Sequence, residues 1–135
     1  MILLRLDKSI VRSTNFAFVY IEEAHAKDEW PIRSSRYMPD NSIVDVEQPK
    51  KIAERIELAQ KFVSTFDLGK EMKVLVDNPE IGNPFEKAYA PWPIRLFVIE
   101  NGVIQFISAP TNCVHDVSEL RRWLEQRHSA GKEES

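Results

Sequence analysis

Apolar residues follow two kinds of spacing along this 135-residue chain, and the continuous apolar runs predict strands. Residues 16–21 form an unbroken apolar run with aromatic and β-branched side chains, which is typical of a strand buried on both faces. Residues 94–99 and 103–107 are two further runs on either side of an Asn-Gly pair, the sequence that most strongly favours a β-hairpin turn. A shorter run over residues 73–77 predicts a fourth strand.

Elsewhere the apolar residues recur every three or four positions, which predicts amphipathic helices. This spacing predicts helices over residues 2–12, 49–64 and 117–128, with a helical turn over 85–89. Pro49 suits the start of the middle helix, whose recurring apolar residues are Ile52, Ile56, Ala59 and Val63. Asp116 and Glu119 have the spacing of a capping box at the start of the last helix.

The order of these elements predicts an α/β fold, a thioredoxin-like sheet with flanking helices. Length predicts a single domain, which we place at residues 1–128, followed by a polar tail at residues 129–135. Because the chain opens on a helix, the first central strand of such a sheet is expected to be missing ahead of residue 1. Pro93 lies where these folds carry a cis-proline facing the active site, so Trp92-Pro93 is the predicted cis bond.

Residues 22–46 show no clean period and predict a long loop, which in a compact domain is usually functional or disordered. The apolar content of 43% excludes wholesale disorder, and a net charge of −3 argues against nucleic acid or an anionic membrane surface as partners. The single cysteine, Cys113, excludes a disulfide framework and a cysteine-based zinc site. The three histidines lack the paired spacing of a metal site, and no apolar run is long enough to predict a membrane span.

Two segments of the chain resemble the iodothyronine deiodinase family. Residues 19–25 read Val-Tyr-Ile-Glu-Glu-Ala-His and are followed by Asp-Glu-Trp at 28–30, which is similar to the family's Tyr-Ile-Glu-Glu-Ala-His stretch with Asp-Gly-Trp a few residues on. Residues 117–125, Val-Ser-Glu-Leu-Arg-Arg-Trp-Leu-Glu, resemble the family's last helix. Weaker matches occur at residues 54–55 and 95–96. The resemblance covers about residues 3–128.

This resemblance implies an oxidoreductase that reductively removes iodide from thyroid-hormone-like iodinated phenols. In the family a low-pKa selenocysteine attacks the iodine and thiols regenerate it, so a thiol reductant is implied as co-substrate and no bound cofactor is expected. His25 and Glu23 are the implied catalytic residues, which would protonate the ring carbon or orient the phenol. Trp30 and Pro93 are the implied substrate-binding residues. The family also implies a homodimer and an N-terminal membrane anchor.

The chain departs from the family at several polar positions. Because no selenocysteine or cysteine precedes the first strand, the reactive atom is expected to lie upstream of Met1, in a segment lost where a UGA codon is taken for a stop. Gln48 stands where the family carries a histidine. Residues 108–112 stand where the family has a glycine-rich turn that contains a hormone-contacting basic residue, and they lack that residue. We therefore expect the chain as printed to be inactive, and its sheet without the central strand to be unstable.

Two alternative functions remain open. One is a degenerate, non-catalytic family member that binds a partner or a hydrophobic phenol. The other is a thioredoxin-like or peroxiredoxin-like reductase whose nucleophile is an upstream cysteine rather than selenocysteine. Without the resemblance, His25 and Glu23 are ordinary solvated loop residues, and Trp30 equally caps the core.

Overall fold

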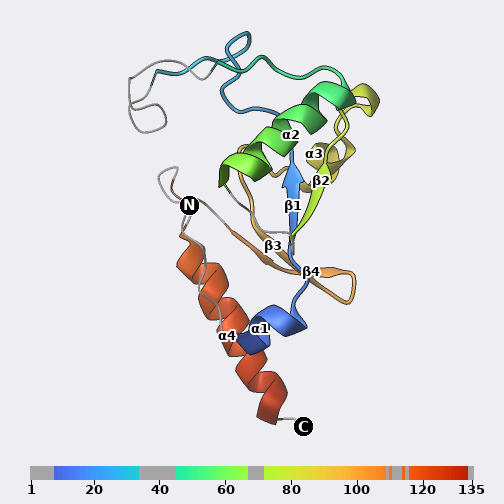
Figure 1. The fold of residues 1–135 in the computed structure, drawn as a ribbon. Coiled ribbons are helices and arrows are strands. Elements are labelled where there is room, and N and C mark those ends of the chain that lie inside the picture. The colour runs from blue at the N-terminus through green and yellow to red at the C-terminus, as the bar shows by residue number, and fades with distance from the viewer. Residues whose placement is uncertain are drawn as a thin grey trace. The chain divides into compact units, whose positions relative to one another are not determined.

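The computed structural model describes residues 8–33, 45–66, 72–108, 110, 114 and 116–133. They divide into two compact units, one of residues 17–93 and one that combines the stretches before residue 17 and after residue 93. Each unit contains helices and strands (Figure 1), which confirms the predicted α/β class. The thioredoxin-like arrangement and the single domain over residues 1–128 remain predictions.

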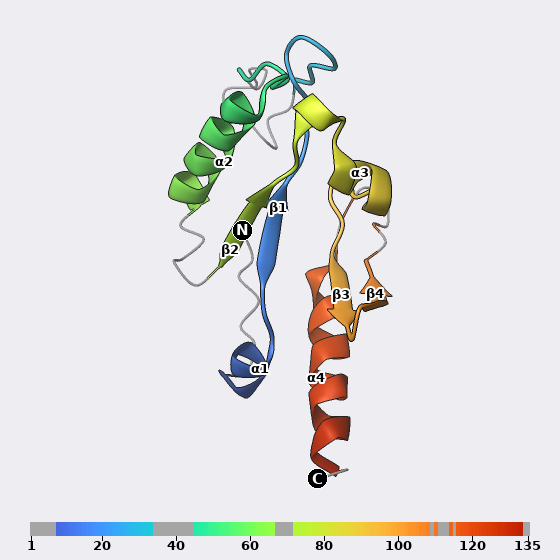
Figure 2. The same ribbon diagram turned by 90° about the vertical axis from the view of Figure 1, so that its right-hand side faces the viewer.

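The unit of residues 17–93 is built on a pair of parallel strands. β1 (Ala17–Tyr20) pairs in parallel with β2 (Lys73–Val76), and α2 (Ile52–Phe66) connects them and packs alongside (Figure 2). A short 3-10 helix, η1 (Pro79–Ile81), and α3 (Pro84–Tyr89) follow β2. The sequence places both strand ends, and the polar segments after them, at one edge of this sheet.

Aromatic stacking attaches α2 to one face of this sheet. The ring of Phe62 on α2 stacks on Phe18 with centroids 5.1 Å apart, and it meets Tyr20 edge-on at 5.8 Å. Successive side chains of a strand point to opposite faces, so Val19 and Leu75 belong to the other face, where Leu75 is 48% exposed. The continuous apolar run predicted burial on both faces, but in the described residues only one face has a covering helix.

The buried face of α2 differs from the predicted one. Ile56 was expected in the core but is 40% exposed, whereas Arg55 and Ala59 are 1% and 3% exposed. The helix is therefore turned so that Arg55, Ala59 and Phe62 face the strands. This orientation is stable because Arg55 finds polar partners from segments far away in the sequence, described below. Ile56 instead borders a groove of about 470 Å³ between α2 and β2.

The second unit is an antiparallel hairpin packed on helices. β3 (Phe97–Glu100) and β4 (Val103–Ile107) form the hairpin, and α1 (Lys8–Ser13) and α4 (Val117–Glu133) accompany it. The turn residues Asn101 and Gly102 both have positive φ, 53° and 76°, as a type I′ turn requires, so the predicted hairpin is confirmed. The apolar core of the unit consists of Ile10, Leu120 and Leu124, with Leu96, Val98, Phe106 and Trp123 packed against it.

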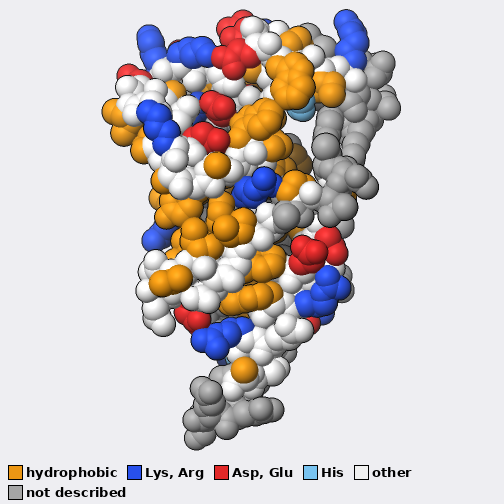
Figure 3. Space-filling model, turned by 180° about the vertical axis from the view of Figure 1, so that it is seen from behind, with side chains coloured by type: hydrophobic (Ala, Val, Ile, Leu, Met, Phe, Trp, Pro, Cys, Tyr) orange, Lys and Arg blue, Asp and Glu red, His pale blue; other side chains and the backbone are white. Residues whose placement is uncertain are grey.

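The hairpin contains a β-bulge at Gln105. Val98 pairs with Phe106 but Ile99 pairs with Ile104, so Gln105 is the extra residue of its strand. Val98 and Phe106 pack on the core. The other face carries exposed apolar side chains, Ile99 (54%), Ile104 (41%) and Ile107 (54%). Hydrophobic side chains at the molecular surface are also evident in Figure 3.

Several boundaries differ from the predicted ones. The helix predicted over residues 2–12 is described from Lys8, because residues 1–7 lie outside the described part of the chain. α4 continues to Glu133 through residues predicted as a polar tail, because a solvent-exposed helix extends on backbone hydrogen bonds without needing an apolar face. Of the helices described, none has the length and apolar character needed to span a bilayer.

Candidate functional site

The loop that leaves the carboxyl end of β1 folds back on itself and brings His25 onto Trp30. The backbone N–H of Trp30 donates to the carbonyl of Ala26 at 3.0 Å, and Ala26 is 1% exposed. Nδ1 of His25 lies 3.3 Å from the carbonyl oxygen of Trp30, and the imidazole meets the indole edge-on with centroids 5.2 Å apart. A predicted catalytic residue and a predicted substrate-binding residue are therefore in contact.

Trp92 joins this cluster from the segment after α3. Its indole stacks on that of Trp30 with centroids 6.0 Å apart and an interplanar angle of 20°. The Trp92–Pro93 bond is cis, which confirms the prediction. Trp30 is 59% exposed, a high value for an indole, and Pro93 is exposed as well. The pair thus offers an aromatic surface beside an imidazole.

Glu23, the second predicted catalytic residue, contacts Tyr20 rather than His25. The Tyr20 hydroxyl donates to Oε1 of Glu23. Burial raises the pKa of Tyr20 well above its usual value, and the Glu23 carboxylate raises it further. The phenol therefore keeps its proton at neutral pH and stays a donor, while Glu23 stays an acceptor.

Gln48 ties the loop after β1 to the segment that leads into α2. This side chain is 7% exposed, and its Oε1 accepts the backbone N–H of Glu23 at 3.0 Å. Its Nε2 donates to the carbonyl of Glu23 at 3.0 Å and to Oε2 of Glu29 at 3.1 Å. The backbone N–H of Gln48 donates to Oδ1 of Asp28 at 2.8 Å. Since both amide atoms are engaged within the protein, Gln48 is a structural brace here.

Arg55 connects α2 to the ends of both strands. Its Nη1 donates to the carbonyl of Asp77 at 3.1 Å and to Oδ1 of Asn83 at 2.7 Å, and Nδ2 of Asn83 donates to Oε2 of Glu22 at 3.3 Å. Nε of Arg55 is buried and has no hydrogen-bond partner among the described residues. Burial lowers the pKa of this guanidinium, an effect that the nearby Asp77 and Glu22 carboxylates oppose.

Two carboxylates follow in the same network. Asp77, 3% exposed, accepts the backbone N–H groups of Phe85 and Glu86, each at 2.9 Å, and so caps the start of α3. The Glu86 carboxylate accepts the backbone N–H of Trp92, but its Oε2 is buried without a partner in the described part of the chain. Burial raises the pKa of Glu86, and the negative charges of Glu22 and Asp77 add to the effect.

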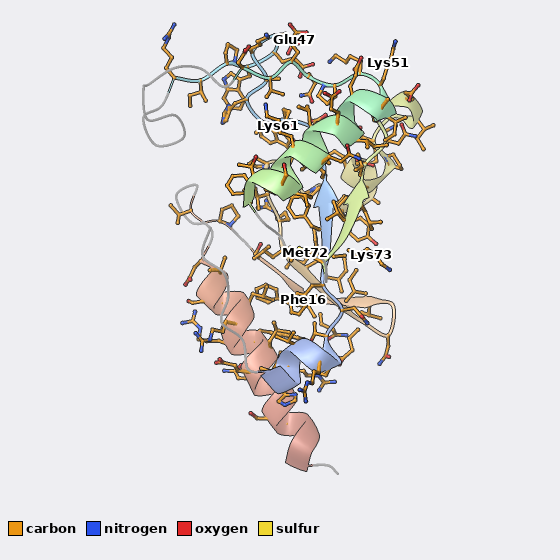
Figure 4. The ribbon with its side chains drawn as sticks, in the orientation of Figure 1. Phe16, Glu47, Lys51, Lys61, Met72 and Lys73 are labelled. Atoms are coloured by element: carbon orange, nitrogen blue, oxygen red, sulfur yellow. The ribbon has the colours of Figure 1, made fainter. Side chains whose placement is uncertain are left out.

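The cations on the loop side of the site are paired. Lys27 contacts Asp45 at 2.7 Å, and Lys50 contacts Glu29. Lys27, Asp45 and Lys50 line a polar hollow of about 680 Å³ between the segment over residues 45–50 and α2. Figure 4 labels two of the residues that line it, Glu47 and Lys61.

The structure places all four predicted site residues in the unit of residues 17–93. His25 contacts Trp30, and Trp30 stacks on Trp92, which directly precedes Pro93. Trp92 was not predicted as a site residue, although its position directly before the expected cis-proline was an available signal. Gln48, Arg55 and Asp77 were also not selected, because their partners come from distant segments. Cys113 and most of the 108–112 turn lie outside the described residues.

Comparisons with known proteins cover nearly the whole chain. A family model described as iodothyronine deiodinase matches residues 3–128. Thyroxine 5-deiodinases of Sus scrofa and Homo sapiens are each 30% identical over 122 residues, which is 90% of this chain and 36% of theirs. The type II iodothyronine deiodinase of Bos taurus is 26% identical over 116 residues, 85% of this chain and 40% of its own length. The chain thus spans little more than a third of these relatives.

Proposed function

We propose that this chain, which belongs to the iodothyronine deiodinase family, forms the substrate-holding and proton-handling part of a reductase that removes iodide from iodinated phenols. In this proposal the nucleophile, a selenocysteine, lies outside the 135 residues, and thiols are the reductant. The observation that carries it is the contact of His25 with Trp30, whose indole stacks on Trp92 directly before Pro93.

The aromatic pair supports the substrate part of the proposal. A phenol ring gains most from offset stacking or edge contact with other rings, and an exposed indole offers both. The imidazole of His25 lies at the edge of Trp30, within reach of a ring bound there. His25 is thus the group best placed to donate a proton to the ring carbon or to hold the phenol hydroxyl.

The Tyr20–Glu23 contact supports the proton-handling part. When selenium takes the iodine, the carbon–iodine bond breaks, and the ring carbon keeps the electron pair and needs a proton. Thiols then release iodide from selenium and are oxidised to a disulfide. We assign Glu23 to holding the loop that carries His25, with the Tyr20 hydroxyl, which keeps its own proton, as its hydrogen-bond donor, and we assign delivery of the proton to the ring carbon to His25.

The pairing of the strands supports a thioredoxin-like whole with a missing central strand. In the described residues β1 pairs with β2 and β3 pairs with β4, so each strand pairs on one side only and each sheet has two edges without a ladder. Two-stranded sheets are marginal in water, and three or more strands are usually required for stability. An additional strand supplied from outside these residues is therefore part of the proposal, as is the homodimer.

The test begins with the DNA that precedes the Met1 codon. We expect an in-frame UGA there, and we expect a protein extended through it, with selenocysteine inserted, to release iodide from an iodinated phenol with excess dithiol. The 135-residue chain should release none. His25→Ala in the extended protein should lower the rate about 100-fold or more, the range of general acid catalysis. Gln126→Ala, on helix α4 of the other unit, is the matched control.

The other outcomes separate the alternatives. A cysteine codon at the upstream position indicates a thioredoxin-like or peroxiredoxin-like thiol reductase. Thermal stabilisation of the chain by a phenolic ligand, without turnover by the extended protein, indicates a non-catalytic binding module. Iodide release by the 135-residue chain contradicts a nucleophile outside it.

A further inference from the structure

Three carboxylates on the loop between β1 and Trp30 accept hydrogen bonds from neutral groups. Glu22, Glu23 and Asp28 accept hydrogen bonds from an amide, a phenol hydroxyl and a backbone N–H respectively. Oε2 of Glu86 is buried without a hydrogen-bond partner in the described residues. Because these donors are neutral, the contacts of Glu22, Glu23 and Asp28 bring no positive charge to their carboxylates.

The nearby cations are engaged or enclosed. Lys27 pairs with Asp45, and Lys50 pairs with Glu29. Arg55 is only 1% exposed and donates inward, so no ligand reaches its guanidinium. Arg33, exposed and three residues after Trp30, is the remaining described cation on this loop.

One acidic residue adjoins each member of the aromatic pair through the backbone. Glu29 directly precedes Trp30 in the chain, and the Glu86 carboxylate accepts the backbone N–H of Trp92. A ring stacked on this pair therefore enters a region of negative potential. The indole faces act in the same direction, because their quadrupole attracts cations.

We propose that this site selects iodinated aromatic compounds whose side chain is an ammonium or a neutral group, and that it discriminates against those that end in a carboxylate. The inference rests on the proposed function, because it takes the Trp30–Trp92 pair as the binding surface. It deepens that proposal by naming the substrate class. The brace made by Gln48 adds to it, since that amide is already saturated and offers no donor to an anionic tail.

The experiment compares three ligands that share an iodinated phenol ring. They are 3-iodotyramine, 2-iodophenol and 3-(4-hydroxy-3-iodophenyl)propionate, which carry an ammonium, no tail and a carboxylate. Binding to the full chain is followed by quenching of tryptophan emission, with Trp123→Phe in the background so that only Trp30 and Trp92 report. N-acetyltryptophanamide controls for collisional quenching by iodine.

We expect the ammonium ligand to bind about tenfold more tightly than the carboxylate ligand at low ionic strength, with 2-iodophenol between them. The difference in affinity between the ammonium and carboxylate ligands should narrow at 0.3 M salt, because salt screens the electrostatic interaction of the site's carboxylates with the ligand. Glu29→Gln and Glu86→Gln should each reduce the ammonium preference. Glu125→Gln, which removes a carboxylate from α4, should leave it unchanged.

Three results overturn the inference. A carboxylate ligand that binds as tightly as the ammonium ligand contradicts the charge preference alone, and loss of that binding in Arg33→Gln would identify the anion anchor. A preference that ignores both salt and the two carboxylate variants contradicts its electrostatic origin. Failure of all three ligands to bind, or binding that survives Trp30→Ala, overturns the charge preference together with the proposed binding surface.

Discussion

The two units of this molecule are stabilised by opposite kinds of interior. In the hairpin unit the buried residues with large side chains are apolar: Ile10, Leu120 and Leu124 are 3%, 9% and 7% exposed. In the unit that carries the site, the deeply buried residues with large side chains are polar, namely Arg55 (1%), Asp77 (3%) and Gln48 (7%). The stability of the first interior depends on how well apolar side chains fill its volume, and that of the second depends on the direction of its hydrogen bonds.

This difference predicts how each unit responds to change. An apolar core tolerates substitutions that conserve volume, because dispersion and burial have no preferred direction. A buried hydrogen-bonded network loses stability when one partner is removed, because the remaining groups stay desolvated and unpaired. The site unit gains fixed positions for Glu22, Glu23 and Trp92 and is more sensitive to single polar substitutions.

Arg55→Met should have the largest effect of the substitutions considered. It keeps a long side chain but leaves the Asp77 carbonyl and Oδ1 of Asn83 without their shared donor, and it removes the positive charge near the Asp77 and Glu22 carboxylates. We expect a loss of about 4 kcal/mol in the free energy of unfolding of the site unit, the usual cost of removing one partner from a buried charged network. Urea denaturation with site-resolved hydrogen exchange measures it.

Arg121→Met is the matched control for that substitution. Arg121 is half-exposed on α4 and pairs with Glu125 one helical turn on, so its loss should cost about 0.5 kcal/mol or less. If Arg55→Met is no more destabilising than Arg121→Met, the polar network does not hold the site unit together.

Leu124→Ala should come next and should act on the other unit. Removing three side-chain carbons from the apolar core should cost about 3 kcal/mol, whereas Leu124→Met should cost less than about 1.5 kcal/mol. Hydrogen exchange should accelerate in β3, β4 and α4 but not in β1 and β2. Equal acceleration in all five strands and helices would show that the two interiors are one cooperative unit.

The smallest effect should be on the pH dependence of stability, which should have opposite signs in the two units. Burial raises the folded-state pKa of Glu86, so its contribution to stability is present at low pH and is lost as pH rises through that pKa. Hydrogen bonds from Ser118 lower the folded-state pKa of Asp116, so its contribution is present at neutral pH and is lost as pH falls through that pKa. Through these two groups, lowering the pH should therefore stabilise the site unit and destabilise the hairpin unit.

Two variants measure this difference. At pH 7, Glu86→Gln should match or exceed the parent chain in stability, and the advantage should shrink as pH falls through the raised pKa of the parent carboxyl. Asp116→Asn should be less stable than the parent at pH 7 and should approach it only below about pH 4, near the usual range of an aspartate. The same sign for both variants across that range would contradict the assignment.

The features predicted correctly from sequence depend on neighbours in the chain. The hairpin follows from Asn101 and Gly102, whose positive φ values the turn requires. The cis bond before Pro93 followed from the order of the elements. The contact of His25 with Trp30 arises within a single turn of loop, so the short motif that suggested both residues also placed them together.

The features that the sequence did not predict depend on distant partners. Hydrophobic spacing pointed Ile56 inward on α2, but Arg55 occupies that face, because Asp77 and Asn83 reach it from the ends of other elements. Nothing in the local pattern distinguishes this arginine from an exposed one. Trp92 and Glu86 likewise acquire their roles through contacts that no spacing rule describes.

The bulge at Gln105 decides which side chains share a face of the hairpin. Strict alternation groups Ile104 with Phe106, yet the extra residue places Ile104 on the side of Ile107, three positions away. Before the bulge, even-numbered residues of β4 therefore lie on the face that odd-numbered residues occupy after it. A one-residue deletion at Gln105 would restore a regular strand in which Ile104 keeps its partner Ile99, and the local coiling of the ribbon, rather than its list of contacts, would be what changes.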